Sequence, residues 1–433
     1  MTGTTPSFAP RFAMHLLAVA AVWALAGAAL AQADAPPPVS PPPPLSPSPS
    51  GPAQPFSFGL SQTLMHESNL FRESANEEED WNSVTALNFA LDQPIGRQRL
   101  HGSAALQMNR YRDHDELNNT GHDVGLQLDW ETVANLSGAL GVQSARRQYR
   151  YGLDSVTPFD GLNIESTQSA FAQGRLGGMG EWALQAGFNA LHREYSADAF
   201  AKLNDLSQWG AEGGIGYRPS PDLGFTALGR YTRISRPDSD LGVGDDVGRK
   251  QLELGVVWQA TGASRLDARV TRAEEKHAVM DDRSFWTGGI GWDWTPSGKL
   301  RLRTQLLRDT EGSSGNVTNL EATMPAAPAG DQLRDAFLWS AQWAASAKIS
   351  LIGTAQWSRR RFNDQFTATG SRIEDRTTAF TLGVRYTPLR ALDLGCDVAT
   401  EKRETNAQTL TEQLVTRPYD AMTAGCSLQF WFR

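Results

Sequence analysis

Apolar and polar residues alternate with a period of two along most of the chain. Leu252, Leu254, Val256 and Trp258 are separated by polar, small or single apolar residues. The same alternation recurs over 286–294, 380–386 and 422–432. Successive side chains of a β-strand point to opposite faces, so each of these segments has one apolar face and one polar or glycine-rich face. The pattern is typical of transmembrane strands with one face in lipid and the other in a wet lumen.

The alternation predicts eighteen strands in residues 56–433. They are expected near 56–66, 80–92, 98–112, 120–130, 136–150, 164–176, 181–195, 205–218, 223–236, 248–260, 265–276, 282–295, 299–309, 331–344, 348–362, 371–387, 391–403 and 418–433. The connections between them are alternately short and long, as in outer-membrane barrels. The predicted fold class is therefore all-β, a transmembrane antiparallel up-and-down β-barrel. Sixteen strands are the alternative, because two hairpins can be misread.

Composition by itself describes a soluble protein, with 433 residues, 40% of them hydrophobic, and a mean hydropathy of −0.40. A soluble all-β sandwich would also produce the alternation. It would not explain Trp and Phe at the ends of the apolar faces together with the short-long asymmetry of the connections. After Pro55 no run of eighteen apolar residues occurs, which excludes a membrane-spanning helix from this part of the chain and favours a closed barrel.

The first 55 residues predict two further segments. Residues 1–33 contain Arg11, an apolar stretch and closing small residues around Ala31 and Ala33, which indicate a secretory signal peptide. An uncleaved anchor is the alternative. Residues 34–55 are rich in Pro, Ser and Ala and predict an extended periplasmic linker. Residues 56–433 are then the barrel, and an even number of strands places both termini in the periplasm.

Partners follow from this placement. We expect the barrel to contact outer-membrane lipid and lipopolysaccharide. Phe430-Trp431-Phe432 resembles the aromatic-ended last strand that the barrel-assembly machinery binds, so that machinery is a further expected partner. No nucleic-acid partner is expected for a chain of net charge −8.

The chain has two cysteines, Cys396 and Cys426, and residue 411 at their midpoint lies near the centre of the predicted loop 404–417. If this loop closes a symmetrical hairpin, the two residues lie opposite each other, within the Cα separation that a disulfide accepts. An oxidising periplasm permits the bond. The alternative is two free thiols that pack as small apolar residues against lipid.

Arginine dominates the basic residues, with 34 Arg and six Lys. Five arginines on the lumen parity are candidate glycan contacts: Arg230, Arg269, Arg301, Arg303 and Arg385. A guanidinium group binds carboxylates, phosphates and sugar hydroxyls in a fixed geometry. The alternative is that these arginines pair with acids of the lumen wall, such as Glu253, Asp267, Asp293 and Asp393.

No motif predicts chemistry at a catalytic, cofactor or metal site. The acidic loop segments 77–80 and 238–246 lack the spacing of a calcium-binding loop and are interpreted as solvated charge. The seven histidines are scattered and none is linked to a nucleophile by a local signature. The prediction is therefore a protein that is not an enzyme and that has no cofactor.

Several turns and strand edges resemble those of β-barrel outer-membrane proteins, described as porins, that are encoded with exopolysaccharide-biosynthesis and exosortase gene clusters. The similar segments are His66-Glu67-Ser68-Asn69-Leu70-Phe71-Arg72, Gln93-Pro94-Ile95-Gly96-Arg97-Gln98, and Trp292-Asp293-Trp294-Thr295-Pro296-Ser297-Gly298-Lys299-Leu300. Glu67 and Ser68 replace two acids of the family's pattern. The resemblance implies a role in the biosynthesis or export of a secreted polysaccharide, and with it periplasmic export components as partners.

Three functions remain in view. The leading hypothesis is a conduit or accessory protein for an exported glycan, because barrels of sixteen to eighteen strands enclose an aqueous channel. The second is a general diffusion porin for small solutes, with residues 310–329 as a constriction loop. The third is a barrel enzyme that modifies lipid or glycan, for which no motif is present.

Overall fold

A computed structural model describes most of the chain after its first 54 residues. The described residues are 55–133, 135–149, 151, 161–177, 181–198, 201, 205–236, 246–278, 282–310, 333–362, 373–407 and 416–432. The predicted signal peptide, nearly all of the Pro-rich linker and, apart from Thr310, the proposed constriction loop therefore lie outside the described residues. Within the described part, no helix is both long enough and apolar enough to cross a membrane.

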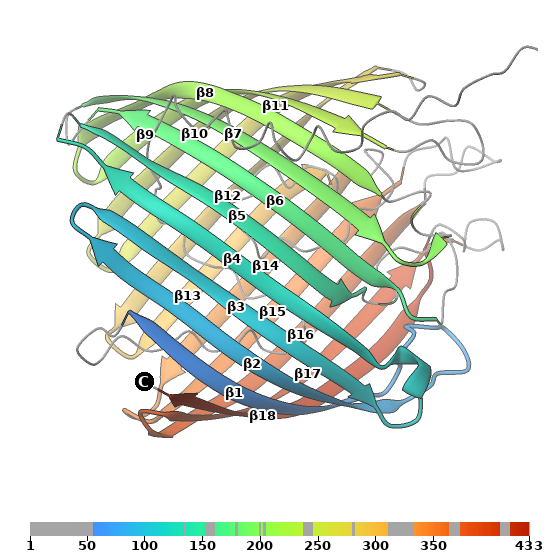
Figure 1. Ribbon diagram of the computed structural model, residues 1–433. Helices are drawn as coiled ribbons and strands as arrows, with labels where there is room; N and C mark the ends of the chain where they lie inside the picture. Colours follow the sequence, from blue (N-terminus) through green and yellow to red (C-terminus); the bar gives the residue numbers. More distant parts are fainter. Residues whose placement is uncertain are drawn as a thin grey trace, which may run out of the picture.

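In the residues that the structure describes, eighteen antiparallel strands form one closed sheet (Figure 1). The strands are β1 (Phe56–Glu67), β2 (Asp80–Ile95), β3 (Gln98–Tyr111), β4 (Asn119–Glu131), β5 (Leu136–Gln148), β6 (Ile164–Leu176), β7 (Trp182–Tyr195), β8 (Leu206–Ser220), β9 (Leu223–Ser235), β10 (Asp246–Thr261), β11 (Ser264–His277), β12 (Arg283–Ser297), β13 (Leu300–Thr310), β14 (Leu333–Ala344), β15 (Ile349–Arg361), β16 (Glu374–Leu389), β17 (Leu392–Thr405) and β18 (Tyr419–Phe432). Each pairs with its sequence neighbours, and β1 pairs with β18 to close the barrel.

The sequence prediction of eighteen strands is confirmed, and the alternative of sixteen is not. Every predicted strand occurs, with its ends within about three residues of the prediction. A short 3₁₀ helix, η1 (Asp115–Leu117), lies between β3 and β4 and was not predicted. The two-residue turn between β2 and β3 needs Gly96, which has φ +64° at the first central position of a tight hairpin.

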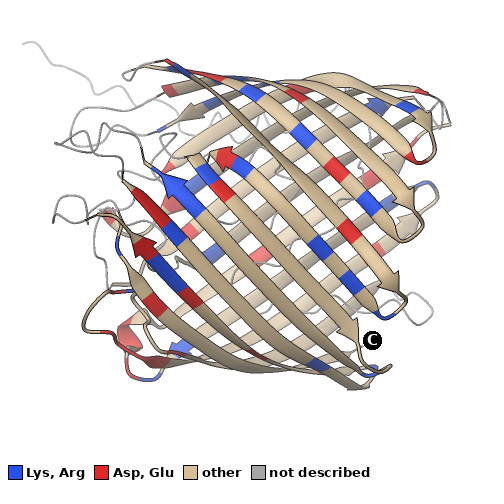
Figure 2. Cartoon of the chain, turned by 180° about the vertical axis from the view of Figure 1, so that it is seen from behind, with Lys and Arg blue, Asp and Glu red and all other residues tan. Residues whose placement is uncertain are grey.

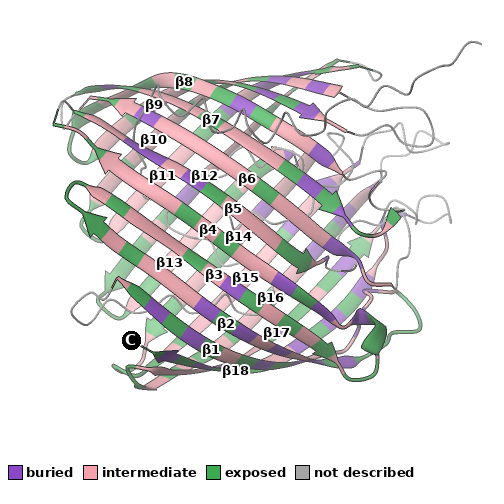
Figure 3. Ribbon diagram, viewed as in Figure 1, coloured by how far each residue is buried: buried purple, intermediate pink, exposed green. Residues whose placement is uncertain are grey.

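The two faces of the sheet differ in exposure (Figure 3). Large apolar side chains on one parity are exposed, for example Leu252 at 58% and Leu382 at 74%. Residues of the other parity are mostly polar, small or glycine, and many are half-buried or buried. Side chains converge on the concave side of a barrel and diverge on its convex side, so the exposed apolar set faces outward.

The apolar outer surface has the height of a membrane. On β15 it runs from Ile349 to Trp357, eight residues apart, which is about 26 Å along a strand. A strand tilt of about 40° reduces this to about 20 Å, close to the apolar band of outer-membrane barrels. Aromatic side chains such as Trp343 and Trp357 lie near its two edges. The barrel therefore has the surface of an integral outer-membrane protein.

The connection after β1 joins the two ends of the sheet. Ser68 donates its backbone N–H to the Met422 carbonyl at 2.9 Å, and Met422 donates its own N–H to the Ser68 hydroxyl at 2.8 Å. The side chain of Asn69, which has no exposed surface, donates to the carbonyls of Glu73 at 2.7 Å and Asp420 at 3.0 Å. These bonds extend the β1–β18 pairing beyond the strands and anchor the connection at the place where the barrel closes.

Candidate functional site

The concave wall of the barrel is the candidate site, because all five predicted arginines lie on it. They come from β9, β11, β13 and β16, so they span a broad arc of the lumen and do not form one cluster. The structure divides them into arginines that are paired with acids of the wall and arginines that are exposed to the lumen.

Arg230 is held between two carboxylates. Its guanidinium lies 2.9 Å from Glu212 on β8 and 3.9 Å from Glu253 on β10, and its side chain is only 8% exposed. The cross-strand register explains the contact, since Glu212 lies directly opposite Arg230 and Glu253 lies on the next strand. A guanidinium between two carboxylates stabilises the wall and has few free donors for a solute.

Arg303 and Arg385 are also paired. Arg303 lies 3.0 Å from Asp293, directly opposite on β12, and Arg385 lies 3.5 Å from Asp397 on β17. The predicted alternative, in which lumen arginines pair with lumen acids, therefore describes three of the five. Of their partners, Glu253 and Asp293 were named from the sequence; Glu212 and Asp397 were missed, although both share the lumen parity of their strands.

Arg269 and Arg301 are different. Both side chains are exposed, and among the residues that the structure describes neither forms an ion pair. Arg269 lies opposite Gly289, which has no side chain to cover it. Of the five candidates, these two guanidinium groups are the ones exposed for contact with a passing solute.

Glycines on the wall make room for charged side chains that lie flat against it. A Cβ at Gly395 would be 2.6 Å from the guanidinium of Arg385, and a Cβ at Gly291 would be 2.6 Å from a carboxylate oxygen of Asp267. Because real Cβ atoms do not approach so closely, a larger residue at either position would push the charged side chain toward the lumen. Glycine at these positions therefore lets the charged side chains lie against the wall instead of extending into the lumen.

Sequence reasoning missed a buried charged triad near the end of the barrel that has the longer connections. The carboxylate of Glu275 lies 2.5 Å from Arg249 and 2.8 Å from Arg283, and its side chain has no exposed surface. His277 lies 3.5 Å from the same carboxylate. The three strands β10, β11 and β12 bring these side chains together because all of them have lumen parity.

A second triad lies on β15, β16 and β17. Asp375 contacts Arg360 at 2.5 Å and Arg403 at 4.0 Å, and it accepts a hydrogen bond from the Thr416 hydroxyl at 2.7 Å. Asp375 is 1% exposed. The signal for both triads was present in the sequence as opposite charges at lumen parity, but the strand register was needed to match them.

One of the two acidic loop segments is structured and not merely solvated. Asp80, which is 2% exposed, accepts hydrogen bonds from the backbone N–H groups of Asp113 and His114 at 3.1 Å. The His114 ring bridges Asp80 at 2.9 Å and Glu78 at 2.7 Å. Burial opposes protonation of this ring, but the two carboxylates outweigh it and raise the pKa of His114. The interpretation of Asp80 as solvated charge is therefore wrong, while most of 238–246 lies outside the described residues.

The two cysteines lie opposite each other on β17 and β18, as the hairpin symmetry predicted. Their Cα atoms are 4.0 Å apart and their sulfur atoms are at bonding distance. Both point outward with the apolar residues of their strands, so the pair is remote from the lumen. In the described part of the chain, no group of three or more His, Cys, Asp or Glu side chains is arranged to hold a metal ion.

The segment His66–Arg72, which carries the family resemblance, has a structural role. Arg72 is 3% exposed and donates to Glu67 at 2.9 Å and to the carbonyl of Asn69 at 2.8 Å. Leu70 packs with Leu117 and Tyr151 in an apolar cluster that joins three connections at one end of the barrel. These contacts hold the connections together at this end of the barrel.

Comparisons with known proteins return solved structures alone. No protein-family model matches the chain, and no curated protein is significantly similar to it. The solved structures include Pseudomonas aeruginosa OccK1 (OpdK), with 14% identity, a TM-score of 0.48 and coverage of 87% of this chain and 99% of that chain. OccK10 (OpdN) from the same organism has 11% identity, a TM-score of 0.47 and coverage of 88% and 100%. Their overall similarity is too low to carry a functional argument.

Proposed function

We propose that the chain is an outer-membrane diffusion porin for small hydrophilic solutes, with its short turns and both termini in the periplasm. The observation that supports this most directly is the concave wall, which is polar, rich in glycine and largely balanced in charge. A pore needs such a wall, because weak contacts distributed along it let a solute enter and leave.

The size of the barrel is consistent with this proposal. Eighteen strands about 4.8 Å apart and tilted by about 40° give a backbone diameter of roughly 35 Å. Side chains reduce the free width, yet barrels of this size enclose an aqueous channel. Arg269 and Arg301, exposed on this wall, would give the lumen a weak preference for anions.

Conductance across a planar bilayer tests the proposal. We expect stable channels with a modest anion preference, and we expect Arg269→Gln with Arg301→Gln to lower the anion-to-cation permeability ratio about twofold. Arg376→Gln is the control, because Arg376 is on the outer face of β16 and should leave the ratio unchanged. A bilayer that stays silent, or a double variant with the wild-type ratio, would contradict the proposal.

Export of a secreted glycan through the same lumen stays a prediction that rests on the sequence resemblance. The two functions differ in how a glycan affects the current. A porin for small solutes conducts ions whether or not a polysaccharide is present, whereas a conduit is blocked while its polymer occupies the lumen. Conductance measured with and without the polysaccharide of the source cell therefore separates them, and block by that polymer alone would favour the conduit.

A further inference from the structure

A cluster of arginines lies on the outer face of the barrel, where lipid rather than lumen is the neighbour. The cluster comprises Arg308 on β13, Arg359 and Arg361 on β15 and Arg376 on β16, with the carboxylates Asp335 and Glu374 between them. The register places all six on the parity of the exposed apolar side chains. Figure 2 shows basic and acidic positions near the strand ends opposite the C-terminus.

The cluster has more positive than negative charge. Arg308 pairs with Asp335 at 3.4 Å, and Arg361 contacts the same carboxylate. Arg359 and Arg376 both pair with Glu374, the latter at 3.2 Å. Four guanidinium groups thus face two carboxylates. Glu404, opposite Arg376 on β17, is itself paired with Lys402 at 3.2 Å, so two positive charges remain in excess. The four side chains remain 36% to 55% exposed, so they have donors available for another anion.

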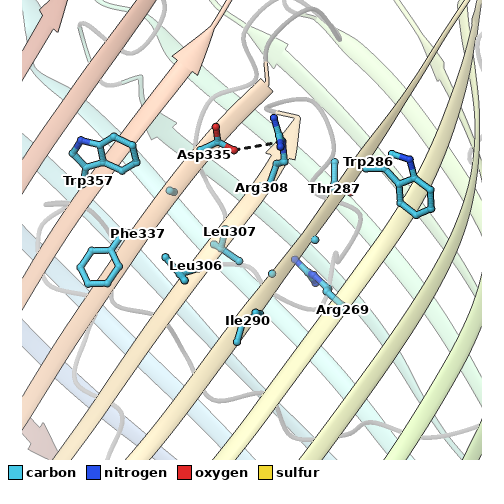
Figure 4. A pocket seen from close by; sticks show the side chains of 13 residues that line it. Arg269, Trp286, Thr287, Ile290, Leu306, Leu307, Arg308, Asp335, Phe337 and Trp357 are labelled. Atoms are coloured by element: carbon cyan, nitrogen blue, oxygen red, sulfur yellow. Dashed lines mark ion pairs between the residues drawn. The ribbon is translucent and has the colours of Figure 1, made fainter.

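Directly beside the cluster is an apolar groove of about 490 Å³. Figure 4 shows its walls, and the outward side chains that form them are Trp286, Ile290, Leu306, Phe337 and Trp357. Gly288 forms part of the floor of the groove and, having no side chain, leaves space there. It lies opposite Arg308 in the β12–β13 pair. The Arg308–Asp335 ion pair closes one end of the groove.

The cluster is at the depth of lipid headgroups. Arg359 follows the aromatic Trp357 by two residues, about 7 Å further along β15 and beyond the apolar band. A hydrocarbon groove that ends in a surplus of guanidinium groups matches a lipid with an acyl chain and phosphate groups.

We propose that this groove and the arginine cluster bind a phosphorylated glycolipid of the outer leaflet. The inference rests on the membrane orientation given with the proposed function. An acyl chain lies over Gly288, and a phosphate accepts hydrogen bonds from Arg308 and Arg361. A zwitterionic phospholipid carries no net charge to balance the two excess guanidinium groups, whereas a bisphosphorylated glycolipid does.

Native mass spectrometry of the full chain, refolded in detergent, tests the proposal with bisphosphorylated lipid A as the probe. Phosphatase-treated lipid A and phosphatidylethanolamine are the comparison lipids. We expect lipid A to bind about tenfold more tightly than either. The treated lipid A has lost its phosphate groups, and the single phosphate of phosphatidylethanolamine is already compensated by the ammonium group of the same headgroup. Equal binding of the treated lipid would overturn the role of the arginines, and tighter binding of phosphatidylethanolamine would overturn the choice of glycolipid.

Variants locate the site. Arg308→Gln with Arg361→Gln should weaken lipid A binding about tenfold, whereas Asp335→Asn should strengthen it, since it removes a competing carboxylate. Arg233→Gln is the matched control, because Arg233 is outward, 52% exposed and paired with Asp246 at 2.8 Å on a distant part of the barrel. A control that loses as much affinity as the double variant would contradict the proposal.

Conductance measured on the same preparations tests the porin function independently of the lipid site. The outer-face variants should conduct like the wild type, because none of the substituted residues faces the lumen. Channels without lipid selectivity would contradict the lipid site alone, and lipid selectivity without channels would contradict the porin alone.

Discussion

Glu275 provides the sharpest test of how the lumen wall is stabilised. Its carboxylate compensates two guanidinium groups, those of Arg249 and Arg283, and it has no exposed surface. The substitution Glu275→Gln preserves the shape of the side chain but removes the charge. Two like charges are then left close together, and the one that is nearly buried, Arg249, loses its counter-charge.

The expected cost follows from the geometry. At an effective dielectric constant of about 20, each charge pair separated by about 4 Å contributes roughly 4 kcal/mol before desolvation is considered. Desolvation of the three groups in the folded state offsets much of that sum. Loss of one partner of a buried pair typically costs about 3–5 kcal/mol, and we expect Glu275→Gln to lower the free energy of unfolding by this amount.

Urea unfolding of the refolded barrel in lipid vesicles, followed by the fluorescence of its 13 tryptophans, measures the loss. Asp246→Asn is the control, because its partner Arg233 is half-exposed and an ion pair exposed to solvent contributes little to stability. Adding Arg249→Met to Glu275→Gln should recover part of the loss, since it removes one uncompensated charge. A loss no larger than that of the control would refute the reasoning.

Three further outcomes are expected. The His114 bridge should order the connection after β3 below pH 6.5, the ordinary pKa of histidine, and this ordering should be lost as the pH rises through the raised pKa of His114. Hydrogen exchange of residues 112–118 measures the ordering, and an exchange rate whose protection does not depend on pH would contradict the prediction. If Cys396 and Cys426 are bonded, the denatured chain should migrate faster in gel electrophoresis without reductant than with it. The bond closes a loop with a sequence separation of 30, so it should add about 3–4 kcal/mol of stability relative to the variant with both cysteines replaced by serine. Asn69→Ala should cost about 1–3 kcal/mol in urea unfolding, because it leaves the Asp420 carbonyl at the barrel closure without its side-chain donor. Ser220→Ala at the exposed end of β8 serves as the comparison, and equal values for the two would contradict this role.

Much of the fold was predictable because a strand's two faces are a local property. The residues that face lipid must be apolar and those that face the lumen need not be, so each strand shows its orientation in its own sequence. Trp258 and Gln259 are adjacent, yet their opposite faces follow from alternation alone. The hairpin register was also partly predictable where a connection is symmetrical, as the opposition of Cys396 and Cys426 shows.

The candidate site was less predictable because an ion pair requires two strands in register. Lumen parity identified Arg230 and Arg269 equally well, but only the neighbouring strands show that Arg230 lies between two carboxylates and that Arg269 is exposed. The same applies to the outer face. Alternation assigns Arg308 to the lipid side, whereas the surplus of arginines around it depends on β14, β15 and β16.

The amino-acid sequence by itself determined the number of strands, their faces and the closed architecture, since these follow from a period of two and from the cost of unpaired backbone groups in a membrane. Only the tertiary structure decided which charges compensate each other and which remain exposed. It also decided that Asn69 contacts Asp420, 351 residues away in the chain. The physical reason is closure of the barrel, which makes neighbours of the first and last strands and sets the register of every strand between them.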